Sequence, residues 1–334
     1  MSESMGTWLP LAFYFLMGLS MLIYSITDGY DLGVGILTLR REGAQRDRMI
    51  ASIGPFWDAN ETWLVLGVGI LLVAFPTAHG VVLTNLYLPA TVMLISLIFR
   101  GVAFDFRAKV AAHQQAVWNR AFFIGSLLAA FTQGCMLGQY IVGFDSGVIS
   151  LYFTVLVGAA LVASYTLIGA CWLVLKCEGE LQRRAIEWAK RSLLFTALGI
   201  ALVSLTTPLA SARIFDKWFS FPELFLLAPI PLTSAALVVA LYLLLRALPL
   251  SGDRFCWLPF ALVVGLFVLC FHGLAYSFYP YIVPDQLLIV DAAAAPESLL
   301  IIFVGTCVVL PVLFAYTVFV YRVFRGKASP LSYQ

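Results

Sequence analysis

The sequence predicts an all-α integral membrane protein with nine transmembrane helices. Apolar residues make up 62% of the chain and charged residues only 11%, whereas soluble domains are about half apolar and a quarter charged. The mean hydropathy is +0.95, and apolar runs of the roughly 20 residues that cross a bilayer recur along the whole chain. No connection between these runs is long enough for a soluble domain, so any chemistry belongs within the bilayer or at its faces.

Nine apolar runs lie between segments rich in charge, proline or glycine. Their expected ranges are 8–27, 55–75, 80–99, 121–142, 148–175, 192–210, 222–245, 256–279 and 298–321. The seventh run contains Pro222, Pro229 and Pro231. Because proline removes a backbone donor and disturbs the turn before it, we expect this helix to be kinked in its first half. Gly29 and Gly33, four residues apart, allow a neighbouring helix to approach closely.

The chain divides into three predicted parts. Residues 1–147 form a first four-helix bundle that holds the acidic motifs described below, and residues 148–282 form a second four-helix bundle. Residues 283–334 supply an outer loop and a ninth, peripheral helix. The short connection at 143–147 sets the first boundary, and no convincing sequence repeat relates the two halves.

The basic residues predict the orientation. Eighteen of the 20 lie in alternate connections or after the last span, and the other side has only Arg213 and Lys217. Short cytoplasmic loops carry the excess of Lys and Arg, so we expect a periplasmic N-terminus and a cytoplasmic C-terminus. The first span begins near Trp8 with only Glu3 before it as a charge, which argues against a cleavable signal peptide.

Ionisable side chains inside the spans are few and gather in the first two. Asp28 and Asp31 end the first span, and Asp58 and Glu61 lie early in the second. A charge at the centre of a bilayer costs about 2.5–3.5 kcal/mol on insertion scales, so such groups mark functional sites by default. Since residues three apart share a helix face, we expect each pair on one face. The predicted orientation places both pairs at the cytoplasmic ends of adjacent helices.

Arg100 closes the third span and is the expected counter-ion of these carboxylates, with Asp105 shortly after it. One interpretation is a polar cluster that is open to the cytoplasm and relays protons inwards. The other is a salt-bridge network that only caps and anchors helices at the headgroups. The second applies most to Asp28 and Asp105 at the predicted boundary, whereas Asp58 and Glu61 lie one to two turns inside and favour function. A cation site made of the same carboxylates cannot be separated from a proton site by sequence.

The sequence offers no resident redox centre. Haem in a membrane bundle usually takes an axial His or Met from a helix, and of the three histidines only His272 lies at membrane depth. A lone helix histidine is more often a hydrogen-bonded core residue. The six cysteines form no CxxC or CxxCH pair, so neither a disulfide framework nor covalent haem is expected. We therefore expect no catalytic residue, cofactor, metal ion or nucleic-acid site in this chain.

Three motifs together resemble subunit II of cytochrome bd-type quinol oxidases. They are Asp-Gly-Tyr-Asp-Leu-Gly-Val-Gly at 28–35, Gly-Pro-Phe-Trp-Asp-Ala-Asn-Glu-Thr-Trp at 54–63 and Phe-Asp-Phe-Arg at 104–107. The resemblance covers the chain from end to end, including the nine-span layout. The wording of residues 57–63 is most similar to the cyanide-insensitive branch of the family.

The resemblance implies a multi-pass subunit of a bacterial inner-membrane complex that oxidises quinol and reduces O2 to water. The partner, subunit I, would carry the haems and this chain none. Membrane lipid is a further expected partner, and a quinone bound to this chain and a small single-helix accessory subunit are left open. Asp58 would belong to a proton route from the cytoplasm, and Trp63 would lie near the point where O2 enters from the lipid. The other proton-path candidates are Glu61, Asp28, Asp31, Arg100 and Asp105.

Two other functions compete with this interpretation. A stand-alone proton- or ion-coupled transporter is the main alternative, although such folds have inverted repeats and broken helices that meet at the midplane. Here the charges gather at one face, and only the seventh span is visibly interrupted. A purely structural partner that stabilises subunit I is the third. The effect of replacing Asp58 separates the structural role from a proton role.

Overall fold

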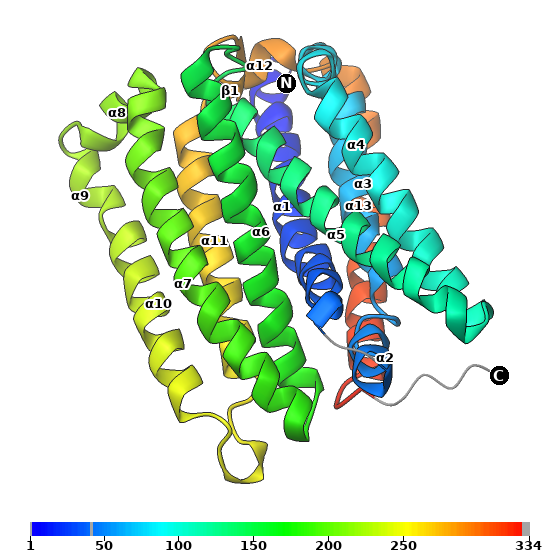
Figure 1. Ribbon diagram of the computed structural model, residues 1–334. Coiled ribbons are helices and arrows are strands. Elements are labelled where there is room, and N and C mark those ends of the chain that lie inside the picture. The colour runs from blue at the N-terminus through cyan, green and yellow to red at the C-terminus, as the bar shows by residue number, and fades with distance from the viewer. Residues whose placement is uncertain (1, 41–42, 329–334) are drawn as a thin grey trace.

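The computed structural model describes residues 2–40 and 43–328. Within these residues nine helices are long and apolar enough to cross a membrane, which confirms the predicted number of spans. Figure 1 shows them as one bundle, with the start of α1 and the end of α13 on opposite sides. The helices are α1 (Ser2–Leu37), α3 (Trp57–Ala74), α4 (Pro76–Lys109), α5 (Ala112–Ile141), α6 (Val148–Lys176), α7 (Gly179–Ala210), α9 (Glu223–Leu227) continued by α10 (Pro229–Ala247), α11 (Leu258–Phe278) and α13 (Pro296–Val323). Arg41, one of the basic residues used to predict orientation, lies outside the described residues.

Four helices extend well beyond their predicted ends. α1 continues to Leu37, α4 continues to Lys109, α5 begins at Ala112, and α7 begins at Gly179. The prediction that Asp28 and Asp31 end the first helix was therefore wrong, because almost two further turns follow Asp31. Hydropathy identifies only the apolar part of a helix. The backbone hydrogen bonds of the same helix continue through the polar residues beside that part.

The seventh membrane segment is interrupted, as its prolines predict. The short helix α9 ends at Leu227, and α10 starts at Pro229 after a break at Ala228. Pro229 occupies the first turn of α10, where its missing N–H leaves no helical hydrogen bond unmade. The predicted kink is confirmed, because the segment consists of two consecutive helices, α9 and α10.

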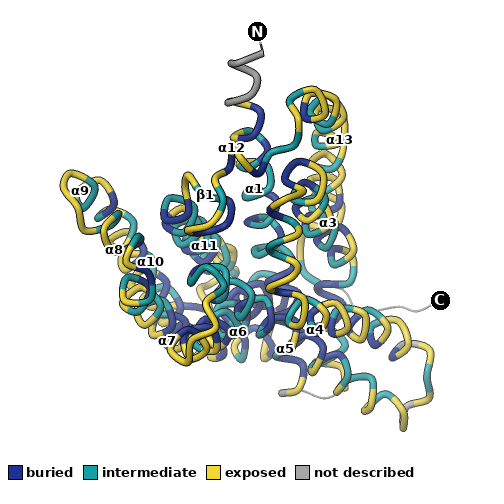
Figure 2. The backbone as a smooth tube through the Cα atoms, turned by 90° about the horizontal axis from the view of Figure 1, so that it is seen from above, coloured by how far each residue is buried: buried dark blue, intermediate teal, exposed yellow. Residues whose placement is uncertain are grey.

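Helix α1 is the centre of the bundle. It packs against α3, α5 and α6, and also touches α11 and α13. Viewed from above, α1 lies between the α3–α13 side and the α11 side, with α6, α5 and α4 along a third side (Figure 2). Any side chain on α1 therefore has neighbours from most of the other helices, which matters because α1 carries the first acidic motif.

Two glycines allow α1 and α6 to cross with their backbones in contact. A Cβ atom on Gly33 would overlap the Tyr165 carbonyl group, and one on Gly169 would lie 2.5 Å from the Gly33 carbonyl carbon. Only glycine fits this crossing, which is the small-residue packing used between membrane helices. The expected close approach at Gly33 is confirmed, and it fixes the height of Asp28 and Asp31 relative to α6.

Shorter elements complete the two ends of the bundle. At the end that includes the predicted outer loop they are α8 (Ala212–Phe219), the two-stranded antiparallel sheet of β1 (Tyr281–Val283) and β2 (Leu287–Leu288), and α12 (Ile289–Ala292). At the other end they are the 3₁₀ turns η1 (Thr38–Arg40) and η2 (Ser251–Asp253), and α2 (Gly43–Ala51). α2 packs beneath the acidic end of α1.

The helices on either side of the predicted boundary at residue 147 are in broad contact. α6 packs along both α1 and α5, while α10 and α11 pack on each other and on α7 and α6 respectively. α13 packs mainly on α1 and α3, and many of its side chains are exposed. The division into two four-helix bundles and a peripheral helix stays a prediction.

Candidate functional site

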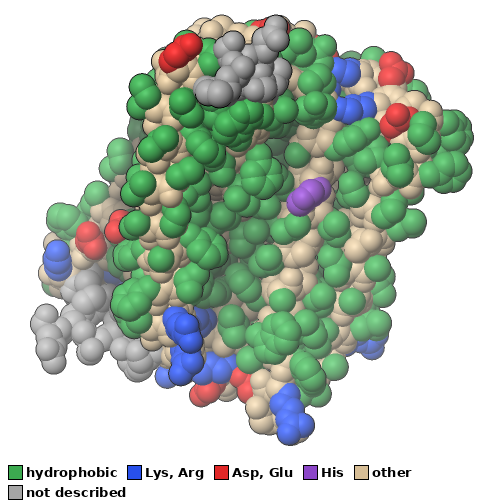
Figure 3. All heavy atoms as spheres, turned by 180° about the vertical axis from the view of Figure 1, so that it is seen from behind, with side chains coloured by type: hydrophobic (Ala, Val, Ile, Leu, Met, Phe, Trp, Pro, Cys, Tyr) green, Lys and Arg blue, Asp and Glu red, His purple; other side chains and the backbone are tan. Residues whose placement is uncertain are grey.

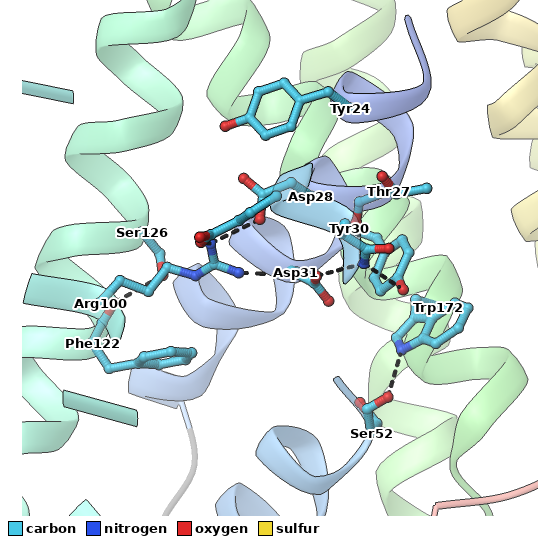
Figure 4. A network of polar contacts seen from close by, with 12 residues as sticks. Tyr24, Thr27, Asp28, Tyr30, Asp31, Ser52, Arg100, Phe122, Ser126 and Trp172 are labelled. Atoms are coloured by element: carbon cyan, nitrogen blue, oxygen red, sulfur yellow. Dashed lines mark hydrogen bonds and ion pairs between the residues drawn. The ribbon is translucent and has the colours of Figure 1, made fainter. Parts of the chain in front are cut away.

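A buried cluster of charged side chains lies where α1, α3 and α4 meet. α1 supplies Asp28 and Asp31, α3 supplies Glu61, and α4 supplies Arg100. Figure 4 shows the Arg100 guanidinium reaching from α4 toward the two α1 carboxylates. The spacing of three between Asp28 and Asp31 turns both toward α4, as helix geometry requires.

The guanidinium group holds the cluster together. Arg100 Nη1 donates to Asp28 Oδ1 at 2.8 Å and to Glu61 Oε1 at 3.0 Å, and Nη2 lies 3.9 Å from Asp31 Oδ2. The side chains of Asp28 and Asp31 are fully buried and that of Arg100 is 1% exposed. Glu61 is the exception, at 29% exposed. Glu61 thus joins the buried interior to the surface of the chain.

Charge is not balanced within this cluster. Three carboxyl groups face one guanidinium, and Asp28 Oδ2, Asp31 Oδ1 and Arg100 Nη2 have no hydrogen-bond partner among the described residues. An isolated buried carboxylate is costly, and buried groups avoid this cost by binding a proton or a polar partner. The arrangement is therefore suited to holding exchangeable protons or water rather than to forming a simple ion pair.

A hydrogen-bonded arm leads from Asp31 to α13. Asn60 Nδ2 donates to Asp31 Oδ2 at 2.7 Å and to the Tyr30 hydroxyl at 2.9 Å. The Tyr321 hydroxyl donates to Asn60 Oδ1 at 3.0 Å and lies 2.6 Å from the Tyr30 hydroxyl. Asn60 therefore connects the carboxylate cluster with the last helix of the chain.

A second polar arm extends above Asp28 toward α5 and α6. Tyr24 lies one turn before Asp28 on α1 (Figure 4). Gln133 on α5 donates to the Tyr24 hydroxyl at 2.8 Å and accepts from the Tyr165 hydroxyl at 2.9 Å. These groups continue the polar network away from the Arg100 end of the site.

The sequence analysis did not single out the residues of these two arms. Tyr24 could have been predicted from the sequence as a site residue, because it shares a helix face with Asp28 at a spacing of four. Asn60 lies inside the acidic motif of residues 54–63, and Gln133 is a polar residue in an apolar run. Tyr321, by contrast, meets Asn60 across 261 positions of sequence. No local pattern predicts that contact.

Two predicted site residues lie outside the cluster. Asp58 is exposed in the first turn of α3, and Asp105 is exposed near the C-terminal end of α4. The expectation that Asp58 lies deeper than Asp28 was wrong, because Asp28 is fully buried and Asp58 is exposed. The reason is that α3 begins only at Trp57, whereas α1 continues well past Asp28.

Trp63 is buried in the interior of the chain. Its side chain is 1% exposed, and its Nε1–H has no hydrogen-bond partner among the described residues. Trp63 therefore does not face the lipid from the surface of this chain.

The histidines occupy separate positions. His79 and His113 lie in the first turns of α4 and α5, and His272 is on α11. His272 is exposed, with Nδ1 2.7 Å from the Val268 carbonyl oxygen. It is hydrogen-bonded as expected but does not lie in the core. Among the described residues, no three His, Cys, Asp or Glu side chains are arranged to hold a metal ion.

The fold and the site define a class of protein: multi-pass helical membrane proteins with a buried ionisable network near one end of the bundle. The sequence model for cytochrome bd terminal oxidase subunit II matches residues 9–324, so the chain belongs to that family. The expected family is confirmed. The chain is thus a multi-pass protein of the bacterial inner membrane and a subunit of a quinol:O2 oxidoreductase.

Characterised relatives support this membership. The chain is 28% identical to cytochrome bd ubiquinol oxidase subunit 2 of Bacillus subtilis, covering 92% of this chain and 94% of that protein. It is 32% identical to cytochrome bd-I ubiquinol oxidase subunit 2 of Escherichia coli over 58% of this chain and 56% of that protein. A solved structure of bd oxidase from Geobacillus thermodenitrificans matches 96% of this chain and 99% of its own with a TM-score of 0.78. At 19% identity, that match shows a shared fold.

Proposed function

We propose that this chain conducts protons from the cytoplasm toward the haem-bearing subunit I of an oxidase that oxidises quinol and reduces O2 to water. The observation that carries the proposal is the buried cluster of three carboxyl groups around Arg100, with Glu61 alone reaching the surface. Ionisable groups that are buried in a membrane protein and exceed their counter-ions are typical of proton relays.

The path we propose starts at Asp58 and passes through Glu61. Asp58 is exposed in the first turn of α3, and Glu61 follows one turn later on the same face. Glu61 accepts from the same Arg100 nitrogen that binds Asp28. A proton that reaches Glu61 is therefore next to the interior carboxyl groups without crossing an apolar layer. Asp105, which is exposed on α4, is proposed as an outlying acid that draws protons to this face.

The proposed direction depends on orientation in the membrane. Figure 3 shows basic side chains gathered at the end where α13 stops, and fewer near the opposite end. Short basic connections stay in the cytoplasm, so we propose that the Arg100 cluster lies toward the cytoplasm and the N-terminus toward the periplasm. Protons used to make water would then come from the cytoplasmic side.

The haems of the complex are proposed to lie in subunit I. They would supply the redox chemistry, and the residues of this chain would deliver and hold protons. The exposed apolar residues of α3, among them Val65 and Leu72, continue the face that begins at Asp58. We propose that subunit I covers this face, so that Asp58 lies at the mouth of a path shared by the two subunits.

A role for Trp63 in O2 access is a separate proposal, supported by the family resemblance. Because its indole is buried between the chain's own helices, O2 would have to diffuse through apolar packing on α3 rather than enter beside an exposed ring. Replacing Trp63 with Phe would then alter the KM for O2 and leave the proton path unchanged.

The test of the proton role uses Asp28→Asn and Asp31→Asn in the complex purified with its haem-bearing partner. We expect quinol-driven O2 consumption per haem to fall about tenfold or more, equivalent to at least about 1.4 kcal/mol of barrier, with the haem absorption spectrum unchanged. Asp47→Asn is the matched control, since that carboxylate pairs with Arg107 at the surface.

Other outcomes identify the competing functions. Normal turnover per haem in both variants would reduce the chain to a scaffold, and a loss of haem would show that the carboxyl groups are needed for assembly of the complex. The transporter function would be supported if the purified chain moved an ion or solute in liposomes without a haem-bearing partner.

A further inference from the structure

A groove opens on the side of the bundle between α11 and α13, with α1 as its floor. Figure 3 shows the hollow from outside, lined by hydrophobic side chains on both walls. The groove has a volume of about 460 Å³ and lies at the inner end of the bundle, beside Tyr321. This volume is many times the roughly 10–15 Å³ that holds one water molecule, so the groove has room for an extended apolar chain.

The walls of the groove offer almost no free hydrogen-bonding groups. Ile26, Phe260 and Val318 are apolar. The hydroxyls of Thr27 and Thr317 donate to carbonyl groups of their own helices, at 2.8 and 3.0 Å. The two tyrosines that line the groove bind each other and Asn60. A ligand that fills this space must therefore be mainly apolar.

One end of the groove carries positive charge. Among the described residues that line it, Arg322 is the one with a formal charge, and it forms no ion pair with another described residue. Arg322 is exposed in the last turn of a membrane-spanning helix, which is headgroup level. Arg325 follows one turn later, and Lys327 is already paired with Asp253. The mouth is therefore complementary to an anion that is attached to an apolar chain.

We propose that this groove binds an anionic phospholipid, with its phosphate on Arg322 and the glycerol end of one acyl chain between α11 and α13. A lipid is the occupant that matches an apolar cleft open sideways to the bilayer with a single cation at headgroup depth. It would also cover the Tyr30–Tyr321 end of the polar network and keep that end apart from the bulk bilayer. The proposal does not depend on the proton role.

The experiment measures lipid retained by the purified complex. The complex is delipidated in detergent, then mixed with detergent micelles that contain phosphatidylcholine and phosphatidylglycerol, and its bound lipid is identified by native mass spectrometry. We expect one retained phosphatidylglycerol above background in the wild type. We expect this adduct to be lost in Arg322→Gln and in Val318→Trp, which fills the groove from a half-exposed position.

The matched control is Arg325→Gln, which removes a neighbouring charge outside the groove lining and should keep the adduct. Equal retention in Arg322→Gln and Arg325→Gln would overturn the proposal, as would retention of phosphatidylcholine or of an isoprenoid quinone in place of phosphatidylglycerol. If Val318→Trp prevents subunit I from co-purifying, the groove is a protein interface and the proposal is wrong. Because none of these variants alters Asp28, Asp31 or Glu61, the result is independent of the proton-path tests.

Discussion

Two arginines on α4 lie seven residues apart and both pair with acids, but the number and burial of those acids differ. Arg100 is fully buried and faces three carboxyl groups, two of which are inaccessible to solvent. Arg107 is 5% exposed and binds one acid, Asp47, whose side chain is 50% exposed, together with the Asn119 side-chain oxygen at 2.7 Å. Both are ion pairs near one end of the bundle, but among the described residues only the Arg100 cluster contains carboxyl oxygens that are both buried and without hydrogen-bond partners.

The comparison separates a site that anchors from a site that can exchange protons. The Arg107 pair is balanced, one cation to one anion, and half-open to water, so it gains nothing from binding a proton. The Arg100 cluster carries surplus negative charge in a medium where that charge is costly. Binding or releasing a proton there changes the net charge of the cluster and therefore its stability. A proton relay requires such a group.

The largest expected effect comes from removing each arginine. Arg100→Ala leaves three carboxyl groups without their cation, and we expect a loss of about 3–5 kcal/mol of stability, seen as a failure to recover the complex. Arg107→Ala leaves behind one acid that is already half-exposed and stays solvated, so the loss should be smaller, about 1.5–3 kcal/mol. Yield of haem-loaded complex and its thermal unfolding midpoint measure both. Equal losses would show that burial and charge surplus do not distinguish the two sites.

A smaller effect is expected for Glu61→Gln, because Glu61 connects the surface to the interior. The amide keeps a hydrogen-bond acceptor for Arg100 but cannot carry a proton. We expect turnover per haem to fall about tenfold, or about 1.4 kcal/mol of barrier, with an unchanged unfolding midpoint. Steady-state O2 consumption measures the turnover, and calorimetry on the same sample measures the unfolding midpoint. Unchanged turnover would show that Glu61 is not part of the proton path.

The smallest effect is expected at the surface acids. Asp58→Asn should lower turnover about threefold, less than 1 kcal/mol of barrier, because water can replace an exposed carboxylate at the mouth of the path. Asp47→Asn, also exposed, should leave turnover unchanged. A larger loss in Asp58→Asn than in Glu61→Gln would place the limiting group at the surface and reverse the order argued from burial.

The sequence predicted the fold well because the bilayer imposes a simple rule. Each span needs a long apolar run, so the nine helices found among the described residues could be predicted from the positions of such runs, and the broken segment at Pro229 from its prolines. Gly33 was also predictable, since a glycine pair at a spacing of four indicates a close helix crossing. Helix ends were less predictable, because the backbone continues through Asp28 and Asp31 where the apolar pattern stops.

The candidate site could be predicted only in part. The association of Arg100 with the acidic motifs followed from their common end of the membrane. The spacing of Asp58 and Glu61 did not reveal how α3 is rotated, and that rotation leaves Asp58 exposed while Glu61 reaches Arg100. The contact between Asn60 and Tyr321 depends on how α13 packs against α1 and α3. Such contacts arise from tertiary packing and have no signal in the local sequence.

The most direct test of the account is an infrared difference spectrum between the oxidised and reduced complex. A surplus carboxyl group that holds an exchangeable proton should give a carbonyl stretching band of a protonated acid that shifts in D2O. We expect this band to be missing in Asp31→Asn and present in Asp47→Asn. A wild-type spectrum without the band, or a band that persists in Asp28→Asn, Asp31→Asn and Glu61→Gln alike, would contradict the claim that the Arg100 cluster exchanges protons during turnover.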